Sequence, residues 1–161
     1  MKHLLIVWHS LTGGSRQMAE AAAAGAAGEA GATLVPAADA DTDAMLRADG
    51  YLFACPENLA SMAGVMKDFF DRTYYPVLGR IEGRPYATMI CAGSDGEGAA
   101  RQIARIATGW RLKPVADPLI VCTHAQTPEA ILAPKTIGER DLARCRELGQ
   151  ALSAGLSLGI F

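Results

Sequence analysis

The chain has 161 residues, enough for one domain with a substantial core and too few for two ordinary domains, so we expect residues 1–161 to form a single domain. Hydrophobic residues make up 50% of the chain and charged residues 20%, proportions typical of a soluble globular protein. The formal net charge of −2 argues against nucleic acid and anionic membranes as partners.

The cysteines and the first apolar run bear on the cellular compartment. The four cysteines are widely spaced and form no C-x-x-C pair, so neither a zinc motif nor a dithiol motif is indicated. Three of them lie at or near the end of apolar runs, which predicts buried free thiols (Cys55, Cys91 and Cys122). The apolar run at 4–8 is too short for a signal peptide or a membrane span. The sequence therefore favours a cytoplasmic location.

Short apolar runs alternate with stretches of helical periodicity along the chain. Pro118 interrupts the last apolar run, which suits a strand at the edge of a sheet. In chain order, the sequence predicts a strand at 3–8, a helix at 15–30, a strand at 32–35, a short helix at 43–48, a strand at 51–55, a helix at 62–73, a strand at 86–91, a helix with its inner face at 99–110, a strand at 115–122 and a helix from about 139.

This alternation predicts an α/β protein whose parallel sheet is covered by helices on both faces. At this size we expect a three-layer sandwich with a five-stranded parallel sheet in the order 2-1-3-4-5. Ligands of such sheets bind outside the carboxyl ends of the strands, where the strand order reverses. The loops after the first, third and fourth strands meet there, and each is rich in small or polar residues (9–15, 56–62 and 92–98).

The first of these loops has the composition of an anion site. Ser10, Thr12 and Ser15 supply three hydroxyl groups, and the glycines at 13–14 allow a tight turn before a helix. The free amides at a helix start, together with the helix dipole, favour a phosphate group. Arg16 is a further candidate contact. The alternative is that Ser15 only caps the helix and the glycines only form the turn.

Several other chemistries do not fit the sequence. No G-x-x-x-x-G-K-[ST] motif occurs and no G-x-G-x-x-G follows a strand, which argues against those nucleotide sites. A C-x5-R phosphatase motif fails because Glu97 stands six positions after Cys91. Receiver domains need acidic residues after the first strand, where this chain has His9 and Ser10. The three histidines share no metal-ligand spacing, so no metal site is expected.

Three segments, taken in order, resemble the flavodoxin-like FMN-binding family, in particular its NAD(P)H-dependent FMN and quinone reductases. Residues 8–19 are similar to its phosphate-binding loop, whose pattern is roughly [ST]-x-T-G-x-[ST]. Residues 56–64, which lead into 67–72, resemble the loop and helix after the third strand. Residues 91–98 stand where the family has a glycine-rich loop along the flavin. The resemblance implies a flavodoxin-like fold and bound FMN.

The resemblance also implies which residues contact FMN. The first loop would hold the phosphate, and the backbone of 57–61, with the Asn58 side chain, would face the pyrimidine edge of the ring. Gly93 and Gly96 would let the third loop lie close to the ring, with Ser94 and Asp95 near the ribityl chain or ring heteroatoms. Asn58 and Asp95 are also turn formers, and Glu57 is also expected to face solvent. The predicted contacts are Ser10, Leu11, Thr12, Gly13, Gly14 and Ser15; Pro56, Glu57, Asn58, Leu59, Ala60 and Ser61; and Ala92, Gly93, Ser94, Asp95 and Gly96.

The sequence departs from the family pattern in the second loop. Leu59 stands where an aromatic residue is frequent, and Ala60 where glycine is frequent. Neither the second nor the third loop has an aromatic residue, whereas carrier flavodoxins usually sandwich the ring between two. Trp8, Tyr74 and Tyr75 are the nearest candidates, although Trp8 is expected in the core and the tyrosines over the sheet.

An open ring face favours an oxidoreductase that moves two electrons from NAD(P)H to quinones, flavins or similar small acceptors. A one-electron carrier of the flavodoxin type is the alternative, although its usual strongly acidic docking surface is not expected at a net charge of −2. A cofactor-free interaction domain is the third hypothesis. Related reductases often assemble as dimers or tetramers, for which residues 74–76 are a candidate surface, with packing inside one chain as the alternative.

Overall fold

The computed structural model describes residues 1–28 and 30–161. A parallel sheet lies at its centre, with neighbouring strands in the order β2-β1-β3-β5, followed by β6 and β7 along the outer side of β5. This arrangement confirms the predicted α/β sandwich and strand order. The strands are β1 (His3–Trp8), β2 (Gly31–Pro36), β3 (Gly50–Asn58), β4 (Ser61–Met62), β5 (Pro85–Ala92), β6 (Lys113–Pro114) and β7 (Leu119–Cys122).

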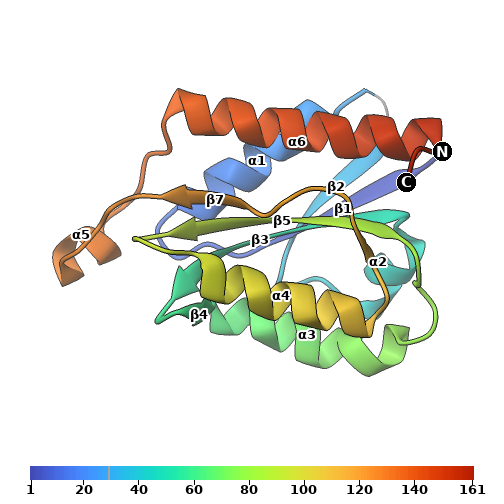
Figure 1. Cartoon of the computed structure of the whole chain (residues 1–161), viewed down its shortest axis with the longest axis horizontal. Coiled ribbons are helices and arrows are strands. Elements are labelled where there is room, and N and C mark those ends of the chain that lie inside the picture. The colour runs from blue at the N-terminus through green and yellow to red at the C-terminus, as the bar shows by residue number, and fades with distance from the viewer. Residues whose placement is uncertain (29) are drawn as a thin grey trace.

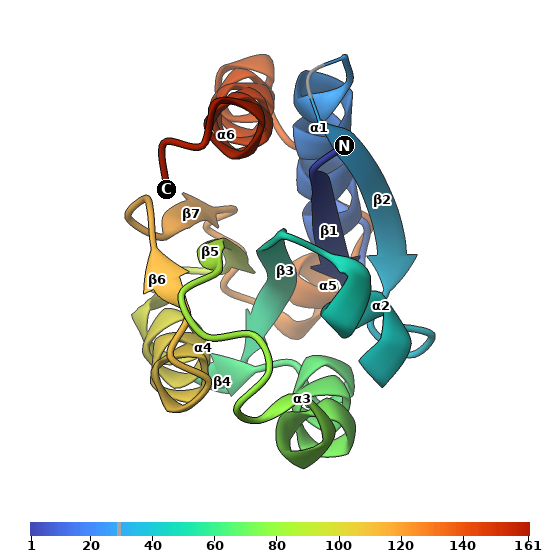
Figure 2. The same ribbon diagram turned by 90° about the vertical axis from the view of Figure 1, so that its right-hand side faces the viewer.

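Helices cover both faces of the sheet (Figures 1 and 2). Helices α1 and α6 lie on one face and α3 and α4 on the other, whereas α5 lies beyond the sheet, at the end where β5 and β7 point. The helices are α1 (Gly14–Ala26), α2 (Thr42–Arg47), α3 (Gly64–Val77), α4 (Glu97–Gly109), α5 (Pro128–Leu132) and α6 (Glu139–Leu158).

The alternation of side chains along β1 explains why the sheet has two apolar faces. Leu4 and Ile6 belong to the core under α1 and α6, and Leu5 and Val7 belong to the core under α3 and α4. Both sets are buried, as expected for a strand covered on both sides. The α3 and α4 side also holds an aromatic cluster in which the Phe70 and Trp110 ring centroids are 5.7 Å apart.

Some element boundaries differ from the sequence prediction. The predicted fifth strand is divided into β6 and β7, and Pro118 lies just before β7, where its missing N–H would interrupt the ladder. Helix α1 ends at Ala26, and position 29 of the predicted helix 15–30 lies outside the described residues. Neither β4 nor α5 was predicted, since both are very short.

The structure also bears on the cysteines and on membrane insertion. All four cysteines are free thiols; Cys55, Cys91 and Cys145 are buried, whereas Cys122 is only half-buried, contrary to the prediction. Within residues 1–28 and 30–161, every helix is too short or too polar to cross a membrane.

Candidate functional site

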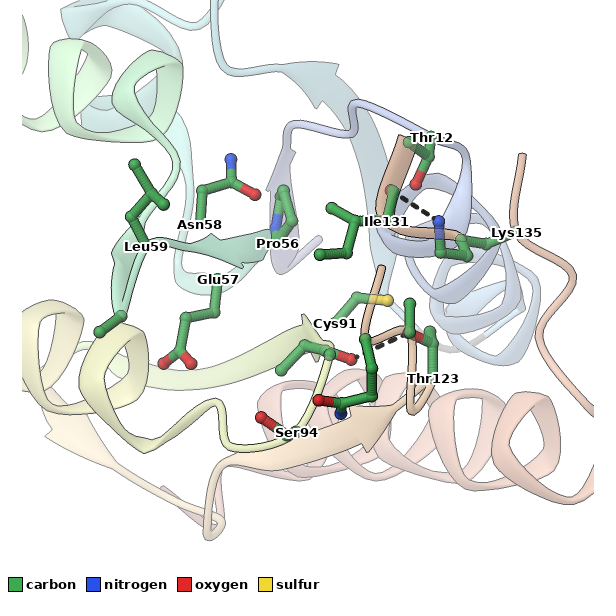
Figure 3. A pocket seen from close by; sticks show the side chains of 15 residues that line it. Thr12, Pro56, Glu57, Asn58, Leu59, Cys91, Ser94, Thr123, Ile131 and Lys135 are labelled. Atoms are coloured by element: carbon green, nitrogen blue, oxygen red, sulfur yellow. Dashed lines mark hydrogen bonds between the residues drawn. The ribbon is translucent and has the colours of Figure 1, made fainter. Parts of the chain in front are cut away.

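A cavity of about 430 Å³ opens at the carboxyl ends of the strands (Figure 3). Its volume lies within the range of small-molecule sites. Its walls come from the ends of β3 and β5 and the loops after β1, β3 and β5, at the predicted edge of the sheet, and from the segment after β7, which was not predicted. The lining residues are Thr12; Pro56, Glu57, Asn58, Leu59 and Ala60; Cys91, Ala92, Gly93 and Ser94; and Thr123, Ala125, Gln126, Ile131 and Lys135.

The loop after β1 turns tightly beside this cavity. Gly13 has a φ of 98°, in the left-handed region that favours glycine, and α1 begins at the next residue. The Gly13 amide donates a hydrogen bond of 3.0 Å to Ser10 Oγ, which closes the turn. The first amides of α1, at residues 14–16, have no acceptor inside the helix and lie at the positive end of its dipole. The loop therefore has the local chemistry of a phosphate site.

The hydrogen bonding of Ser15 distinguishes phosphate binding from simple helix capping. The N-cap of α1 is Gly13, and among residues 1–28 and 30–161 no side chain caps this end, so the alternative that Ser15 is the cap is wrong. The Ser15 hydroxyl is buried and has no hydrogen-bond partner within the described residues. An unpaired buried hydroxyl costs about 1–3 kcal/mol, a cost that an anion accepting its hydrogen bond would remove. The donors of this loop therefore fit the phosphate of FMN.

Gly14 and Cys91 bring the first loop against the end of β5. A Cβ atom added at Gly14 would lie 2.6 Å from Cys91 Sγ, so a larger residue there would force Cys91 to move. Burial raises the pKa of the Cys91 thiol to about 11, which keeps it neutral at physiological pH. Cys91 therefore forms part of a neutral wall of the cavity (Figure 3).

The loop after β3 is a tight hairpin. Asn58 pairs with Ser61 across the antiparallel β3 and β4 strands, leaving Leu59 and Ala60 as a two-residue turn. These two residues have φ values of 53° and 62°, in the left-handed region where such turns usually place Asn or Gly. The Leu59 side chain is fully exposed beside the cavity. The departure from the family pattern at Leu59 and Ala60 therefore coincides with strained backbone.

Glu57 is half-buried and hydrogen-bonded, whereas it was expected to face solvent. Its carboxylate accepts hydrogen bonds from the Gly96 amide at 2.9 Å and the Ala99 amide at 3.0 Å, both at the start of α4. A carboxylate at this position satisfies free amides and interacts favourably with the helix dipole. The Glu57 side chain therefore joins the second loop to the third, and Glu57 also lines the cavity.

The third loop contributes fewer lining residues than predicted. Gly93 and Ser94 line the cavity, but Asp95 and Gly96 do not. Asp95 accepts a hydrogen bond of 3.3 Å from the Glu97 amide, which is the turn-forming role. Gly96 has a φ of 91°, in the left-handed region that favours glycine, and a Cβ atom there would lie 2.6 Å from Ile120. Its backbone conformation and its packing against β7 explain this glycine better than room for a flavin does.

The remaining predicted contacts lie around the cavity, outside its lining. Leu11 is exposed, and Ser61 donates a hydrogen bond of 3.1 Å to Gln102 on α4. Arg16 lies 3.8 Å from Glu20 in an exposed ion pair. The predicted positions outside the lining are Ser10, Leu11, Gly13, Gly14, Ser15, Ser61, Asp95 and Gly96.

The segment after β7 supplies the part of the site that sequence reasoning missed. Thr123, Ala125, Gln126, Ile131 and Lys135 line the cavity from residues 123–135. Ile131 lies across from Pro56 in Figure 3, and every residue of α5 is exposed. The prolines and the lack of a periodic apolar pattern left this segment without a sequence signal.

The cavity lining described above includes no aromatic side chain. Tyr74 stacks on Trp110 of the same chain, with ring centroids 5.5 Å apart. This contact fits the alternative that residues 74–76 pack inside one chain. Tyr75, next to Tyr74 near the end of α3, is exposed. Trp8 is half-buried against the core under α1 and α6. The described residues also contain no cluster of three potential metal ligands.

Comparisons with known proteins show the family to which this chain belongs. The model of the family described as NADPH-dependent FMN reductase matches residues 26–126. The chain is 26% identical to a flavodoxin of Aquifex aeolicus, over 98% of this chain and 89% of that protein. Among solved structures, a flavodoxin from the domain Archaea has a TM-score of 0.77 at 18% identity, covering 96% of this chain and 98% of that one. A flavodiiron protein from Giardia intestinalis has a TM-score of 0.78 at 16% identity, covering 99% of this chain and 37% of that one.

The fold and the family relationship define a flavodoxin-like, FMN-binding flavoprotein of the oxidoreductase and electron-transfer class. Because the family model covers more than half of the sequence, the chain belongs to the NADPH-dependent FMN reductase family.

Proposed function

We propose that this protein is an FMN-dependent reductase that accepts two electrons from NAD(P)H and passes them to a quinone, a free flavin or a similar small acceptor. The cavity without aromatic side chains carries this proposal, because a ring bound there would keep one face open for a second planar molecule. Membership of the reductase family supports the same function. The low net charge offers little electrostatic steering toward a large protein partner.

Each wall of the cavity has a role in this function. FMN, when bound, supplies the two-electron chemistry, and the protein supplies position and electrostatics. The first amides of α1 and the Ser15 hydroxyl would hold the phosphate. The 58–61 hairpin would face the pyrimidine edge of the ring, with Asn58 as a hydrogen-bonding side chain. Pro56, Cys91 and Ala92 would form a wall of low polarity that excludes water from one side.

The mouth of the cavity would admit both the nicotinamide and the acceptor. Leu59 is fully exposed at one side and Ile131 is half exposed at another, so planar apolar molecules would meet apolar side chains there. Since one open face would serve both molecules in turn, NAD(P)+ must leave before the acceptor binds. We therefore expect ping-pong kinetics.

Anaerobic mixing of the FMN-loaded protein with NADPH, and separately with NADH, tests the reductase function. At least one nucleotide should bleach the visible flavin absorbance, and adding a quinone should restore it. If neither nucleotide bleaches a flavin that dithionite does reduce, the protein is not an NAD(P)H-dependent reductase.

The similarity to the Aquifex aeolicus flavodoxin favours a second candidate, a one-electron carrier. Stepwise reductive titration separates the two functions. A carrier should take up its two electrons in two resolved steps, whereas the proposed reductase should be reduced in a single two-electron step.

Assembly as a dimer or tetramer stays a prediction, with the exposed Tyr75 at the end of α3 as its candidate contact. Light scattering on the wild-type protein and on Tyr75→Glu measures it directly. A monomeric wild-type protein, or an oligomer that Tyr75→Glu leaves intact, would exclude this contact.

A further inference from the structure

The segment 123–138 forms one wall of the cavity but has little packing of its own. It runs from the end of β7 to the start of α6 and extends beyond the sheet, with α5 in its middle (Figure 1). Nearly all of its residues are exposed or half-buried, Ile137 being the buried exception. We call this segment the arm. Something other than burial must hold the arm beside the cavity.

At the β7 end, the Thr123 and His124 amides donate hydrogen bonds to the Ala92 and Gly93 carbonyls. Near α6, the side chain of Gln17 makes the connection. Its Nε2 donates hydrogen bonds to the Gly13 carbonyl at 2.9 Å and the Lys135 carbonyl at 2.7 Å. Its Oε1 accepts a hydrogen bond of 2.9 Å from the Ile137 amide. Alongside these, the Lys135 amide donates to the Thr12 carbonyl at 2.8 Å. One amide side chain on α1 thus joins the first loop to the arm, about 120 residues later in the chain.

The arm extends this connection toward the mouth of the cavity. Lys135 Nζ donates hydrogen bonds to the Ile131 carbonyl at 2.8 Å and the Ala133 carbonyl at 2.6 Å, at the end of α5. Ile131 and Lys135 both line the cavity. The place of Ile131 therefore depends on Lys135, and the place of Lys135 depends on Gln17 and Thr12.

We propose that Gln17 is a positioning residue that couples occupation of the first loop to the placement of the arm beside the cavity. The Gly13 carbonyl, which Gln17 contacts, belongs to the loop assigned to the phosphate, so this inference rests on the proposed FMN site. Binding that orders the loop stabilises the Gln17 contacts and with them the arm. The coupling is reciprocal, so loss of the arm contacts weakens FMN binding.

Hydrogen exchange of the Ile137 amide, with and without FMN, is the most direct test. In the wild-type protein, FMN should slow exchange of this amide. In Gln17→Met, which keeps the size of the side chain but removes its hydrogen bonds, the amide should exchange at least about tenfold faster and FMN should no longer slow it. The dissociation constant for FMN should rise about tenfold in the same variant.

Two further variants control the experiment. Gln150→Met changes an exposed glutamine on α6 and should leave both readouts at the wild-type values. Lys135→Met removes the ammonium contacts to α5 but keeps the backbone groups that Gln17 contacts. It should therefore loosen α5 while the Ile137 amide stays protected by FMN.

The outcomes separate this inference from the proposed function. Unchanged Ile137 exchange and FMN affinity in Gln17→Met would overturn the coupling, whether or not NADPH reduces the flavin. If Gln17→Met changes Ile137 exchange and FMN affinity as expected but neither NADPH nor NADH reduces the wild-type flavin, Gln17 keeps its proposed role. The reductase function would then be rejected. Faster exchange with unchanged FMN affinity would also overturn the proposal, because Gln17 would then only fasten the arm.

Discussion

Ser15 and Ser153 are both buried, but their hydroxyl groups have different surroundings. Ser153 Oγ accepts a hydrogen bond of 2.7 Å from the Ala30 amide and donates one of 3.0 Å to the Ala26 carbonyl, which joins α6 to the end of α1. Ser15 Oγ has no partner within the described residues. The Ser153 hydroxyl stabilises the fold, whereas the Ser15 hydroxyl would gain a partner from a bound anion.

Ser15→Ala should therefore leave the free energy of unfolding of the FMN-free protein unchanged or slightly higher. The same substitution should weaken FMN binding about tenfold, because one donor to the phosphate is lost. Urea unfolding and FMN titration measure the two effects. Ser153→Ala is the matched control: it should lower the free energy of unfolding by about 1–3 kcal/mol and leave FMN affinity unchanged. A loss of stability in Ser15→Ala without a loss of affinity would contradict the assignment.

The buried cysteines should make the protein less stable in alkaline solution. Burial raises the pKa from 9.0 to about 12 for Cys55 and to about 11 for Cys91 and Cys145. Above about pH 9 the unfolded chain loses these protons while the folded chain keeps them, so the free energy of unfolding falls as pH rises through this window. Urea unfolding between pH 8 and about pH 11 should show the decline. Cys91→Ala should make the decline shallower than in the wild-type protein, and equal slopes in the two proteins would contradict this cause.

Among the elements, the hairpin between β3 and β4 stores backbone strain next to the cavity. Ala60 has a φ of 62°, and glycine adopts this conformation at no steric cost. Ala60→Gly should raise the free energy of unfolding by about 1 kcal/mol, as measured by urea unfolding. Ala133→Gly provides the control, since Ala133 is exposed with a φ of −71° and should give no gain. A loss of stability in Ala60→Gly would show that the turn is not strained.

The long elements could be predicted from the sequence because their periodic patterns are strong. Strands β1, β3 and β5 are apolar runs buried on both faces, and α3, α4 and α6 have one apolar side each. The hairpin could not be predicted, because β4 has only two residues and its turn is Leu-Ala where Asn-Gly would be the usual signal. The arm could not be predicted because its contacts to Thr12 and Gln17 span more than 100 residues of chain.

The candidate site, like the fold, could be predicted only where a local sequence pattern determines it. Small and polar residues after strands marked the three loops correctly as neighbours of a cavity, since strand order alone places them at one edge. The side-chain roles of Glu57 and Gln17 depend on where α4 and the arm pack, which no local pattern encodes. Whether the predicted residues contact FMN stays a prediction that the ligand measurements test.

At the scale of the whole molecule, polar side chains hold the walls of the cavity in place around a rigid sheet. Glu57 and Gln102 join the hairpin to α4, and Gln17 joins the arm to α1. The walls therefore come largely from loops and strand ends, whereas the elements that hold them are long helices packed on the sheet. This arrangement would allow the sheet to stay unchanged while the mouth adjusts to nicotinamide or acceptor.

Comparing the affinities for FMN and riboflavin is the most direct test of the central claim, which is that the loop at 10–15 holds the phosphate of FMN. The two ligands share the ring and the ribityl chain and differ only in the phosphate. Equilibrium dialysis should show FMN bound at least about a hundredfold more tightly than riboflavin, since several donors would contact the phosphate. Thr12→Arg, which places a bulky side chain in the loop, should remove that preference. Equal affinity for the two ligands in the wild-type protein would contradict the account.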